Sequence, residues 1–362
     1  MRYYNTSKID KKNATYNVIF GERSNGKTYA LLKKGLQNWV KDRSQMAYVR
    51  RWKEDITGRR ASRLFSGLCE NDEVRKLTDG EYDGIHYYAG KWYMCRYDDN
   101  GKAIYSDLDI VCFAFALSDG EHDKSTSFPN IRTVVFDEFL TAKLYLQDEF
   151  VHFMNTISTI VRRREDVKIY MLGNTVNKYC PYFEEMGLNH IKKMEQGSID
   201  LYQYGDSTLT VAVEYCASQN TNKNKKVNKY FAFNNPKLKM ITGGAWEMSL
   251  YPHLPMKYKP SDVVLNFFID FSDTLYQGNV ILIDGDAFIY IHKKTSPLKN
   301  NSLDMVYTLE HSIKTNYNRS IFKPMNKLQN KITMLFKTDR VFYQNNDVGD
   351  AINNYLKICR GL

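Results

Sequence analysis

The sequence of 362 residues has little cysteine and no long apolar run. Its six cysteines are scattered, with no C-x-x-C pair and no histidine cluster beside them. This pattern argues against a zinc site or a disulfide framework, and it favours reduced thiols in a cytosolic compartment. The longest apolar run, 110–117, is far too short to cross a bilayer, and residues 1–5 lack the apolar core of a signal peptide. We therefore expect no membrane contact.

Two features of the composition remain once these classes are set aside. Aromatic residues make up 14% of the chain, and 51 Lys and Arg against 41 Asp and Glu give a formal charge of +10. An excess of positive charge favours a polyanionic partner without proving one. The length suits about two domains, each with a core of its own.

A glycine-rich stretch near the start has the pattern G-x-x-x-x-G-K-T and follows the apolar run 16–20. Helical spacing of apolar residues predicts a helix directly after it, from Lys27 to about Lys41. A strand, such a loop and a helix in this order form a phosphate-binding loop, whose backbone N–H groups point at one anion. The predicted nucleotide-binding residues are Gly21, Glu22, Arg23, Ser24, Asn25, Gly26, Lys27 and Thr28.

Two of these residues are given separate chemical roles. The Lys27 amine is expected to reach the β- and γ-phosphates of the nucleotide, and the Thr28 hydroxyl to bind Mg²⁺. The alternative is a glycine-rich turn without function. The apolar strand before the loop and the helix after it favour the nucleotide site.

A second stretch, 131–138, is an apolar, β-branched strand that ends in two adjacent carboxylates. This is the form of a Walker B element, in which Asp137 holds Mg²⁺ and Glu138 polarises the attacking water. The plainer alternative is a strand that runs out into an acidic loop. The phosphate loop upstream favours the catalytic interpretation.

A predicted amphipathic helix over 150–161 ends in three arginines, 162–164. They are either a solvated helix end or, in a ring ATPase, groups that neutralise charge at a neighbour's nucleotide. The next predicted strand, 167–172, leads to Asn174, which is either a sensor of the γ-phosphate or a turn residue. Another short strand, 46–49, ends on the basic run 50–53, which faces either a ligand crevice or water.

Together these residues resemble the DNA-packaging (encapsidation) motor ATPases of small short-tailed bacteriophages, the phi-twenty-nine group. These are ring-forming relatives of the FtsK- and HerA-type DNA translocases. The resemblance covers 16–183. Its most specific parts are Tyr-Val-Arg-Arg at 48–51 and the run Phe-Pro-Asn before a strand that ends Phe-Asp-Glu-Phe, 128–139. The other matching segments are 18–28, 161–165, Asn174 and 181–183.

The resemblance implies residue roles that the sequence alone does not. It implies that ATP is the nucleotide, and that Arg162 is inserted into the site of the adjacent subunit, with Arg164 as the alternative. Lys124 matches a lysine that acts in trans in the family, although by itself it reads as a loop residue.

The predicted fold class is α/β. A phosphate-loop (ASCE, RecA-like) NTPase domain with a mainly parallel sheet is expected over 1–215, with 56–105 as an insertion on that sheet. A basic linker is expected over 216–260, where lysines alternate with aromatic residues and suit either nucleic-acid contact or a solvated linker.

The last part of the chain, 261–362, is predicted to be a small α+β domain with a three-stranded meander within 263–291 and a helix near 350–358. It weakly resembles the ribonuclease-H-like nuclease domain of larger phage motors. In the phi-twenty-nine group this domain lacks the metal-binding carboxylates and contacts nucleic acid and the ring. Asp270 lies on the first strand, but two-metal cleavage needs several convergent carboxylates, so nuclease activity is not expected.

The resemblance implies an ATP-driven double-stranded DNA translocase that packages a viral genome into a preformed capsid. The implied partners are double-stranded DNA, a five-membered homo-oligomeric ring, and the portal and capsid, and the lysine-rich second half would suit a structural packaging RNA. The implied location is the host cytoplasm and, transiently, the portal vertex. The alternatives are another phosphate-loop translocase or helicase, a nucleotide-gated DNA-binding protein, and a terminase with an active nuclease.

Overall fold

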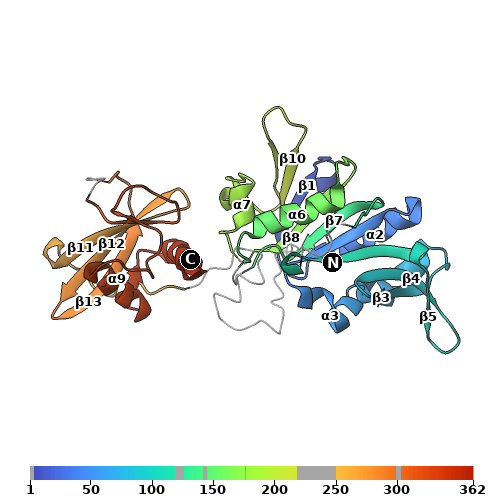
Figure 1. Ribbon diagram of the computed structural model, residues 1–362, viewed down its shortest axis with the longest axis horizontal. Helices are drawn as coiled ribbons and strands as arrows, with labels where there is room; N and C mark the ends of the chain where they lie inside the picture. Colours follow the sequence, from blue (N-terminus) through green and yellow to red (C-terminus); the bar gives the residue numbers. More distant parts are fainter. Residues whose placement is uncertain are drawn as a thin grey trace, which may run out of the picture. The chain divides into compact units, whose positions relative to one another are not determined.

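The computed structural model describes residues 4–119, 126–141, 145–175, 177–217, 250–298 and 303–361. The chain divides into two compact units, Met1–Glu247 and Met248–Leu362, and each is described by itself (Figure 1). Lys124 and most of the predicted basic linker lie outside the described residues. The expectations for them, and the domain limits at 215 and 260, stay predictions. Within the described ranges, no helix is long and apolar enough to cross a membrane.

The first unit is built on a ten-stranded sheet of order β3-β4-β6-β2-β7-β8-β1-β10-β9, with β5 paired to β4. The six strands from β6 to β10 in this order are parallel, and β3, β4, β5 and β9 pair antiparallel. The predicted α/β fold with a mostly parallel sheet is therefore confirmed. The strands are β1 (Tyr16–Gly21), β2 (Gln45–Arg50), β3 (Gly84–Tyr88), β4 (Lys91–Tyr97), β5 (Ala103–Ile104), β6 (Ile110–Ala116), β7 (Ile131–Asp137), β8 (Lys168–Asn174), β9 (Ile199–Gln203) and β10 (Thr210–Tyr215).

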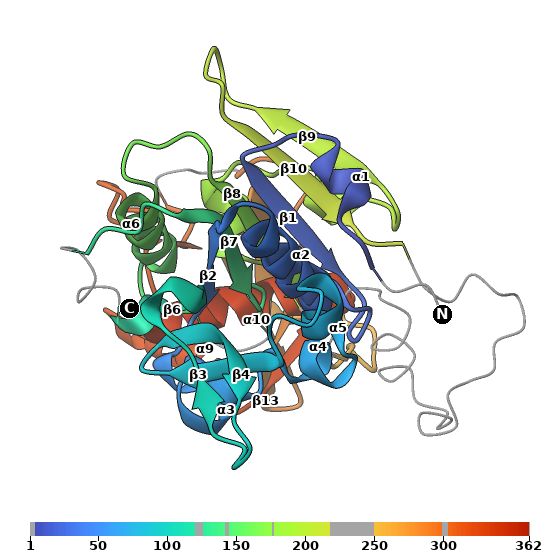
Figure 2. The same cartoon turned by 90° about the vertical axis from the view of Figure 1, so that its right-hand side faces the viewer.

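Helices cover both faces of this sheet (Figure 2). Alternate residues of a strand point to opposite faces, so Val134 and Phe136 of β7 pack on the α6 side and Val135 packs on the α2 side. Burial on both faces explains why the central strands are almost continuously apolar. The helices are α1 (Ser7–Asp10), α2 (Lys27–Asp42), α3 (Gly58–Ser62), α4 (Ser66–Glu70), α5 (Glu73–Leu77), α6 (Glu149–Val161) and α7 (Pro181–Glu185).

The segment predicted as an insertion extends the sheet itself. Its β3–β4 hairpin turns at Ala89 and Gly90, which have φ values of 47° and 79°, the backbone that a two-residue turn between twisted strands requires. Strand β4 then pairs antiparallel with β6. Trp92 of β4 is buried, and its indole Nε1 donates to Ala61 O of α3 at 2.8 Å. The hairpin and the short helices therefore belong to the same core as the parallel strands.

The second unit holds a six-stranded sheet of order β15-β14-β11-β12-β13-β16. The predicted meander is present as the antiparallel strands β11, β12 and β13, whereas β14, β15 and β16 add in parallel at the two edges. These edge strands were not predicted, because two or three residues are too few to show a period. The elements are β11 (Val263–Phe271), β12 (Thr274–Ile283), β13 (Asp286–Lys293), β14 (Val306–Thr308), β15 (Tyr317–Asn318), β16 (Val341–Tyr343), α9 (Lys327–Lys337) and α10 (Asn346–Gly361).

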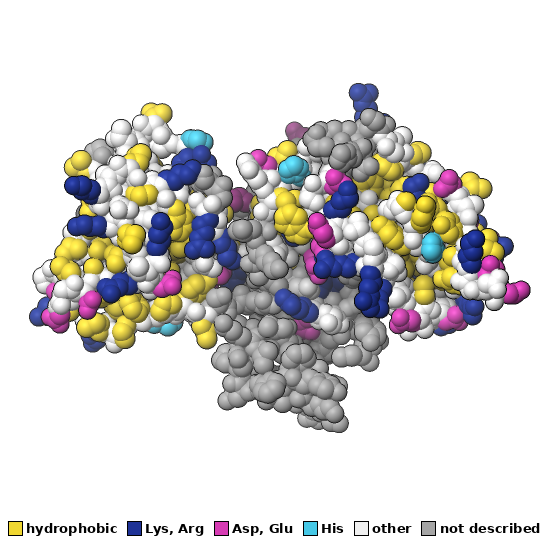
Figure 3. Space-filling view, turned by 60° about the horizontal axis from the view of Figure 1, so that its bottom comes forward, with side chains coloured by type: hydrophobic (Ala, Val, Ile, Leu, Met, Phe, Trp, Pro, Cys, Tyr) yellow, Lys and Arg dark blue, Asp and Glu magenta, His cyan; other side chains and the backbone are white. Residues whose placement is uncertain are grey.

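Aromatic contacts join this sheet to its two helices. The rings of Phe267 on β11 and Phe336 on α9 lie 6.3 Å apart, and those of Phe271 and Tyr355 on α10 lie 6.0 Å apart. Gly278 on β12 lies under the Phe267 ring, where a Cβ atom would be only 2.2 Å from it. On the face drawn in Figure 3, Lys and Arg side chains are spread over the surface of this unit among hydrophobic and neutral ones.

Candidate nucleotide-binding site

The predicted site residues come together at the carboxyl edge of the parallel sheet. Gly21 ends β1 and is paired with Asn174, the last residue of β8. Asp137 ends β7, and Arg50 ends the neighbouring strand β2. Because parallel strands end at the same edge, residues far apart in the sequence lie side by side there.

The phosphate loop holds its lysine in a buried position. Gly26 has a left-handed backbone (φ 89°) and precedes α2, whose first residue, Lys27, is only 6% exposed. The Lys27 Nζ donates to Glu22 O at 2.7 Å and to Asn25 Oδ1 at 3.1 Å. It also donates to Asn174 Oδ1 at 3.3 Å, which links the loop to β8. Burial lowers the pKa of this amine, because an apolar environment disfavours its charged form.

The Thr28 hydroxyl donates to Asp137 Oδ2 at 2.8 Å, although the two residues are 109 positions apart. The same carboxylate oxygen accepts a hydrogen bond from Tyr48 OH at 2.8 Å. Burial, and then the Asp137 charge, raise the pKa of Tyr48, so its hydroxyl stays protonated. Tyr48 was not predicted as a site residue. The signals in the sequence were its position near the end of a short predicted strand and its place in the Tyr-Val-Arg-Arg segment, 48–51.

Glu138 follows Asp137 with a left-handed backbone (φ 57°). This conformation costs about 1–2 kcal/mol for a non-glycine residue, and the Glu138 N–H is held by Asp137 Oδ1 at 2.9 Å. The Glu138 side chain is 57% exposed and forms an ion pair with Arg50 at 2.5 Å. Arg50 also contacts Asp55 at 3.3 Å, so its charge is shared between two carboxylates.

Arg51 was predicted among the cations that face a ligand crevice or water, and this prediction was wrong. Its guanidinium is buried against Glu149 in the first turn of α6, with N–O distances of 2.6 and 2.8 Å. It also donates to Phe139 O at 2.7 Å and to Glu138 O at 3.2 Å. Tyr182 OH donates to the same Glu149 at 2.8 Å. A glutamate at the start of an amphipathic helix is common, so the sequence carried no sign of this pairing.

The residues at this edge fit a magnesium–triphosphate. In the described part of the chain, no group of three or more His, Cys, Asp or Glu side chains could hold a metal ion by itself. A phosphate loop needs only a hydroxyl and a carboxylate beside phosphate oxygens, and Thr28 and Asp137 supply these. A Cβ atom on Gly21 would lie 2.9 Å from Cys216 Cβ, so only glycine fits there. Among the described residues, no hydrogen-bond donor reaches the buried Glu22 Oε1.

The three arginines after α6 differ in their surroundings. Arg162 and Arg163 both have a left-handed backbone, with φ of 40° and 64°, and Arg163 is exposed. Arg164, the alternative to Arg162 in the sequence prediction, ties the end of α6 to the start of β7. Its guanidinium donates to the carbonyl oxygens of Phe128, Pro129, Ile131, Ile160 and Val161.

In the second unit, Asp270 lies on β11 as predicted. Burial, followed by repulsion from Glu310 and Asp273, raises the pKa of its carboxyl. Within the described ranges, these carboxylates do not form a group that could hold a metal ion.

The fold and the site together define an α/β protein of the phosphate-loop class. The chain belongs to the podovirus DNA encapsidation protein (Gp16) family, whose sequence model matches residues 1–226. The resemblance stated from the sequence is therefore confirmed. The DNA packaging proteins of Bacillus phages phi29 and PZA are each 30% identical to it over 184 residues, which is 50% of this chain and 49% of theirs. The chain thus spans about half the length of the curated relatives it matches.

Two solved structures are similar over nearly the whole chain. One is the bacteriophage Phi-29 viral genome packaging motor assembly, with a TM-score of 0.55, 20% identity, and coverage of 97% of this chain and 96% of the other. The other is the Phi-28 gp11 DNA packaging motor, with a TM-score of 0.54, 18% identity and coverage of 98% of each chain. At these identities the likeness establishes a shared fold.

Proposed function

We propose that this chain is the ATPase of a DNA-packaging motor, an ATP-driven translocase that moves double-stranded DNA into a preformed viral capsid. The observation that carries the proposal is the 2.8 Å contact between Thr28 and Asp137, beside Lys27 and Glu138 at one edge of the sheet. Membership of the encapsidation family and the packaging proteins among its relatives support DNA as the substrate. The charge of +10 suits such a polyanion.

The residues proposed to bind the nucleotide form hydrogen bonds with one another in this structure. In the proposal, the Lys27 amine exchanges the oxygens of Glu22 and Asn25 for the β- and γ-phosphates. The Thr28 hydroxyl and the Asp137 carboxylate hold Mg²⁺, which supplies positive charge against the triphosphate. Tyr48 keeps the Asp137 carboxylate oriented through its hydrogen bond.

Glu138 is proposed to orient the attacking water. Its exposed carboxylate must leave Arg50 to do so, and Arg50 keeps a second carboxylate partner, Asp55, when this happens. The backbone of Glu138 is held by Asp137 on one side and by Arg51 on the other. The backbone of Glu138 is therefore fixed, while the Glu138 side chain can move. Asn174, already bonded to Lys27, is proposed to sense loss of the γ-phosphate.

A neighbouring subunit is proposed to complete each site. Two consecutive left-handed non-glycine residues, Arg162 and Arg163, are strained, and such strain clusters at functional sites. We assign the trans role to Arg162, because Arg164 is bound to carbonyl oxygens of its own subunit. Lys124 is proposed to act in trans as well. The proposal includes a homo-oligomeric ring of five, the portal and a structural packaging RNA, with the motor acting at the portal vertex in the host cytoplasm.

For the second unit we infer a ribonuclease-H-like fold that has no nuclease activity and contacts nucleic acid. The antiparallel meander, extended in parallel beside β11 by β14 and β15, supports this fold. The basic linker over 216–260 is proposed to join the two units. Incubation of the protein with plasmid DNA and Mn²⁺ tests the absence of cleavage, and nicked or linear product would contradict it.

The catalytic assignment is tested with Glu138→Gln. This variant should bind ATP as the native protein does, yet hydrolyse it at least about a hundredfold more slowly, because general-base contributions are typically of this size. Glu185→Gln, an exposed substitution on α7, is the matched control and should keep native turnover. Full ATP turnover by Glu138→Gln, measured with and without DNA, would make the assignment wrong.

Two further experiments test the ring and the packaging role. Mixing Arg162→Ala subunits with Glu138→Gln subunits should restore some intact interfaces and therefore some ATPase activity, if Arg162 acts in trans. No recovery at any mixing ratio would argue against this. Co-sedimentation with empty capsids should separate a packaging motor from a helicase that has the same ATPase core.

A further inference from the structure

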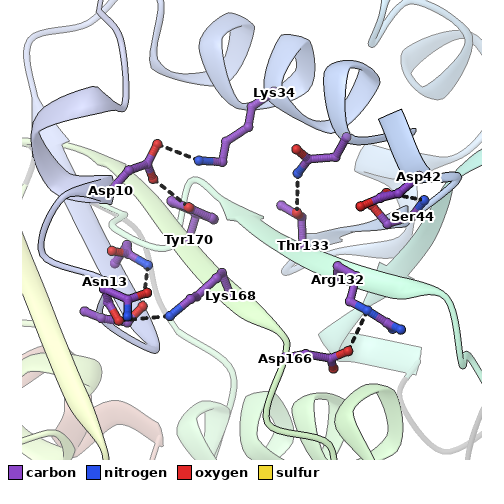
Figure 4. A pocket seen from close by; sticks show the side chains of 13 residues that line it. Asp10, Asn13, Lys34, Asp42, Ser44, Arg132, Thr133, Asp166, Lys168 and Tyr170 are labelled. Carbon is purple, nitrogen blue, oxygen red and sulfur yellow. Dashed lines mark hydrogen bonds and ion pairs between the residues drawn. The ribbon is translucent and has the colours of Figure 1, made fainter. Parts of the chain in front are cut away.

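A polar cavity of about 400 Å³ lies at the amino edge of the same sheet, at the opposite ends of the strands from the nucleotide site. Its walls are the first residues of β1, β7 and β8, the inner side of α2, and the segment before β2 (Figure 4). Nothing in the proposed ATPase mechanism uses these residues. The volume is within the range of ligand sites in proteins.

Three carboxylates line this cavity: Asp10 and Asp166 are bound by cationic side chains, whereas Asp42 accepts a hydrogen bond from Ser44 N at 3.0 Å. Asp10 accepts from Tyr170 OH at 2.7 Å and from Lys34 Nζ at 2.5 Å. Asp166 is paired with Arg132 Nε at 2.6 Å. The negative charges of Asp10 and Asp166 are therefore neutralised in place, as the dashed lines in Figure 4 indicate.

Two nitrogen donors that line the cavity can form further hydrogen bonds. Lys168 Nζ donates to Asn13 O at 2.9 Å, and no carboxylate of a described residue lies within ion-pair distance of it. Burial lowers the pKa of this lysine, because its charge is only partly compensated by the more distant Asp10. Among the residues that the structure describes, the Asn38 amide nitrogen donates only to Thr133 Oγ1, at a long 3.4 Å. An ammonium group has three N–H donors, so Lys168 can donate to a further anionic group.

Two buried polar side chains lie at the floor of the cavity. Asn17 is 2% exposed, and its amide nitrogen donates to Ala14 O and Ile169 O. Thr133 is 3% exposed, and the long contact with Asn38 is its one side-chain hydrogen bond among the described residues. Both side chains therefore have protein partners, and they make the floor of the cavity polar.

The segments that border the cavity add positive charge. Residues 8–13 and 41–44 contain five Lys or Arg and two Asp. An excess of this size along one edge attracts an extended polyanion more strongly than it does a single small anion, because the field reaches beyond the cavity itself.

We propose that this cavity receives a backbone phosphate of a nucleic acid, with Lys168 and Asn38 as its donors and the basic rim along the neighbouring phosphates. The inference rests on the proposed function for the presence of a nucleic-acid substrate. It adds a second phosphate-binding position that is separate from the nucleotide loop and lies at the other edge of the sheet.

The test introduces a carboxylate at the cavity without changing side-chain volume. Asn38→Asp should weaken binding of a short duplex by about fivefold or more at 0.1 M salt, and lower the slope of log K against log salt by about 0.9 for each phosphate that the protein no longer neutralises. Gln37→Glu is the matched control, because it adds the same charge to the preceding residue of α2 at an exposed position. The control should bind DNA with close to native affinity and slope.

Lys168→Gln and Lys168→Arg give an independent reading. Lys168→Gln should lower the slope by about 0.9, and Lys168→Arg should keep it, because the charge is retained. Native DNA binding by both Asn38→Asp and Lys168→Gln would overturn the proposal. Displacement of DNA from this site by millimolar nucleoside monophosphate would overturn the assignment to a polymer.

Basal ATPase activity without DNA is measured for every variant. It should stay native, since the cavity is at the opposite edge from the catalytic residues. If the cavity variants keep native ATPase activity and also bind DNA as the native protein does, only the cavity proposal is wrong. If the native protein itself has no ATPase activity, the proposed function is wrong instead.

Discussion

Replacing Arg51 with methionine would remove the positive partner of Glu149 while keeping much of the side-chain volume. The side chain of Glu149 is 0% exposed and that of Arg51 is 7% exposed, so the ion pair is buried. Tyr182 OH and Leu146 N still donate to Glu149 in the variant, each at 2.8 Å. They satisfy its lone pairs but leave its charge without a counter-ion.

Removing one partner of a buried ion pair costs about 3–5 kcal/mol. Because two donors remain, we expect Arg51→Met to lower the free energy of unfolding of the first unit by about 3 kcal/mol, at the lower end of that range. The double variant Arg51→Met/Glu149→Gln removes the stranded charge and should regain about 2 kcal/mol. It should not regain full ATP turnover, because Arg51 also holds the backbone oxygens of Glu138 and Phe139.

Urea unfolding followed by tryptophan fluorescence measures this effect in the first unit, because all four tryptophans precede residue 250. Arg59→Met, an exposed change on α3, is the control and should alter the free energy of unfolding by less than about 0.5 kcal/mol. Equal urea midpoints for Arg51→Met and the control would refute the reasoning. So would a double variant less stable than Arg51→Met alone.

Three other outcomes follow from the same set of interactions. Burial raises the pKa of the Glu214 carboxyl above its ordinary value of 4.5, so its contribution to stability is present below that pH and is lost as the pH rises through the folded-state pKa. Urea unfolding between pH 4 and 7 should therefore show that Glu214→Gln loses less stability with rising pH than the native protein does. Parallel stability profiles for the two proteins would contradict this. Arg164→Gln should lower the free energy of unfolding by about 2 kcal/mol, because the hydrogen bonds from Arg164 to carbonyl oxygens are removed. The control Arg163→Gln should lower it by less than about 0.5 kcal/mol. Similar urea midpoints for the two variants would show that the Arg164 hydrogen bonds do not contribute to stability. Tyr48→Phe should slow ATP hydrolysis about tenfold and leave ATP binding nearly unchanged, because losing a hydrogen bond to a charged group has an effect of about this size. Native ATP turnover in this variant would exclude a role for the Tyr48 hydroxyl.

The regular elements of both units could be read from the sequence because their patterns are long. The strands around 16–20, 131–137 and 263–271 are apolar or alternating over five or more residues, and the structure has β1, β7 and β11 there. Helix α9 and the short strands at the edges of the second sheet escaped prediction. Their stability comes from partners elsewhere in the chain rather than from local periodicity.

By itself the sequence determined that a phosphate loop and an acidic strand end are present, since both are local patterns of residue type and spacing. Only the tertiary structure decided which side chains each of them meets. Parallel pairing of β2, β7, β8 and β1 places Tyr48, Asp137 and Asn174 at one edge, and the strand order cannot be read from local spacing. The basic residues show the same limit, because Arg50, Arg51 and Arg164 look alike in the sequence. In the structure, Arg50 pairs with an exposed carboxylate, Arg51 is buried in an ion pair, and Arg164 donates to backbone oxygens. The partner of a charged side chain is set by long-range packing, which a run of adjacent arginines does not encode.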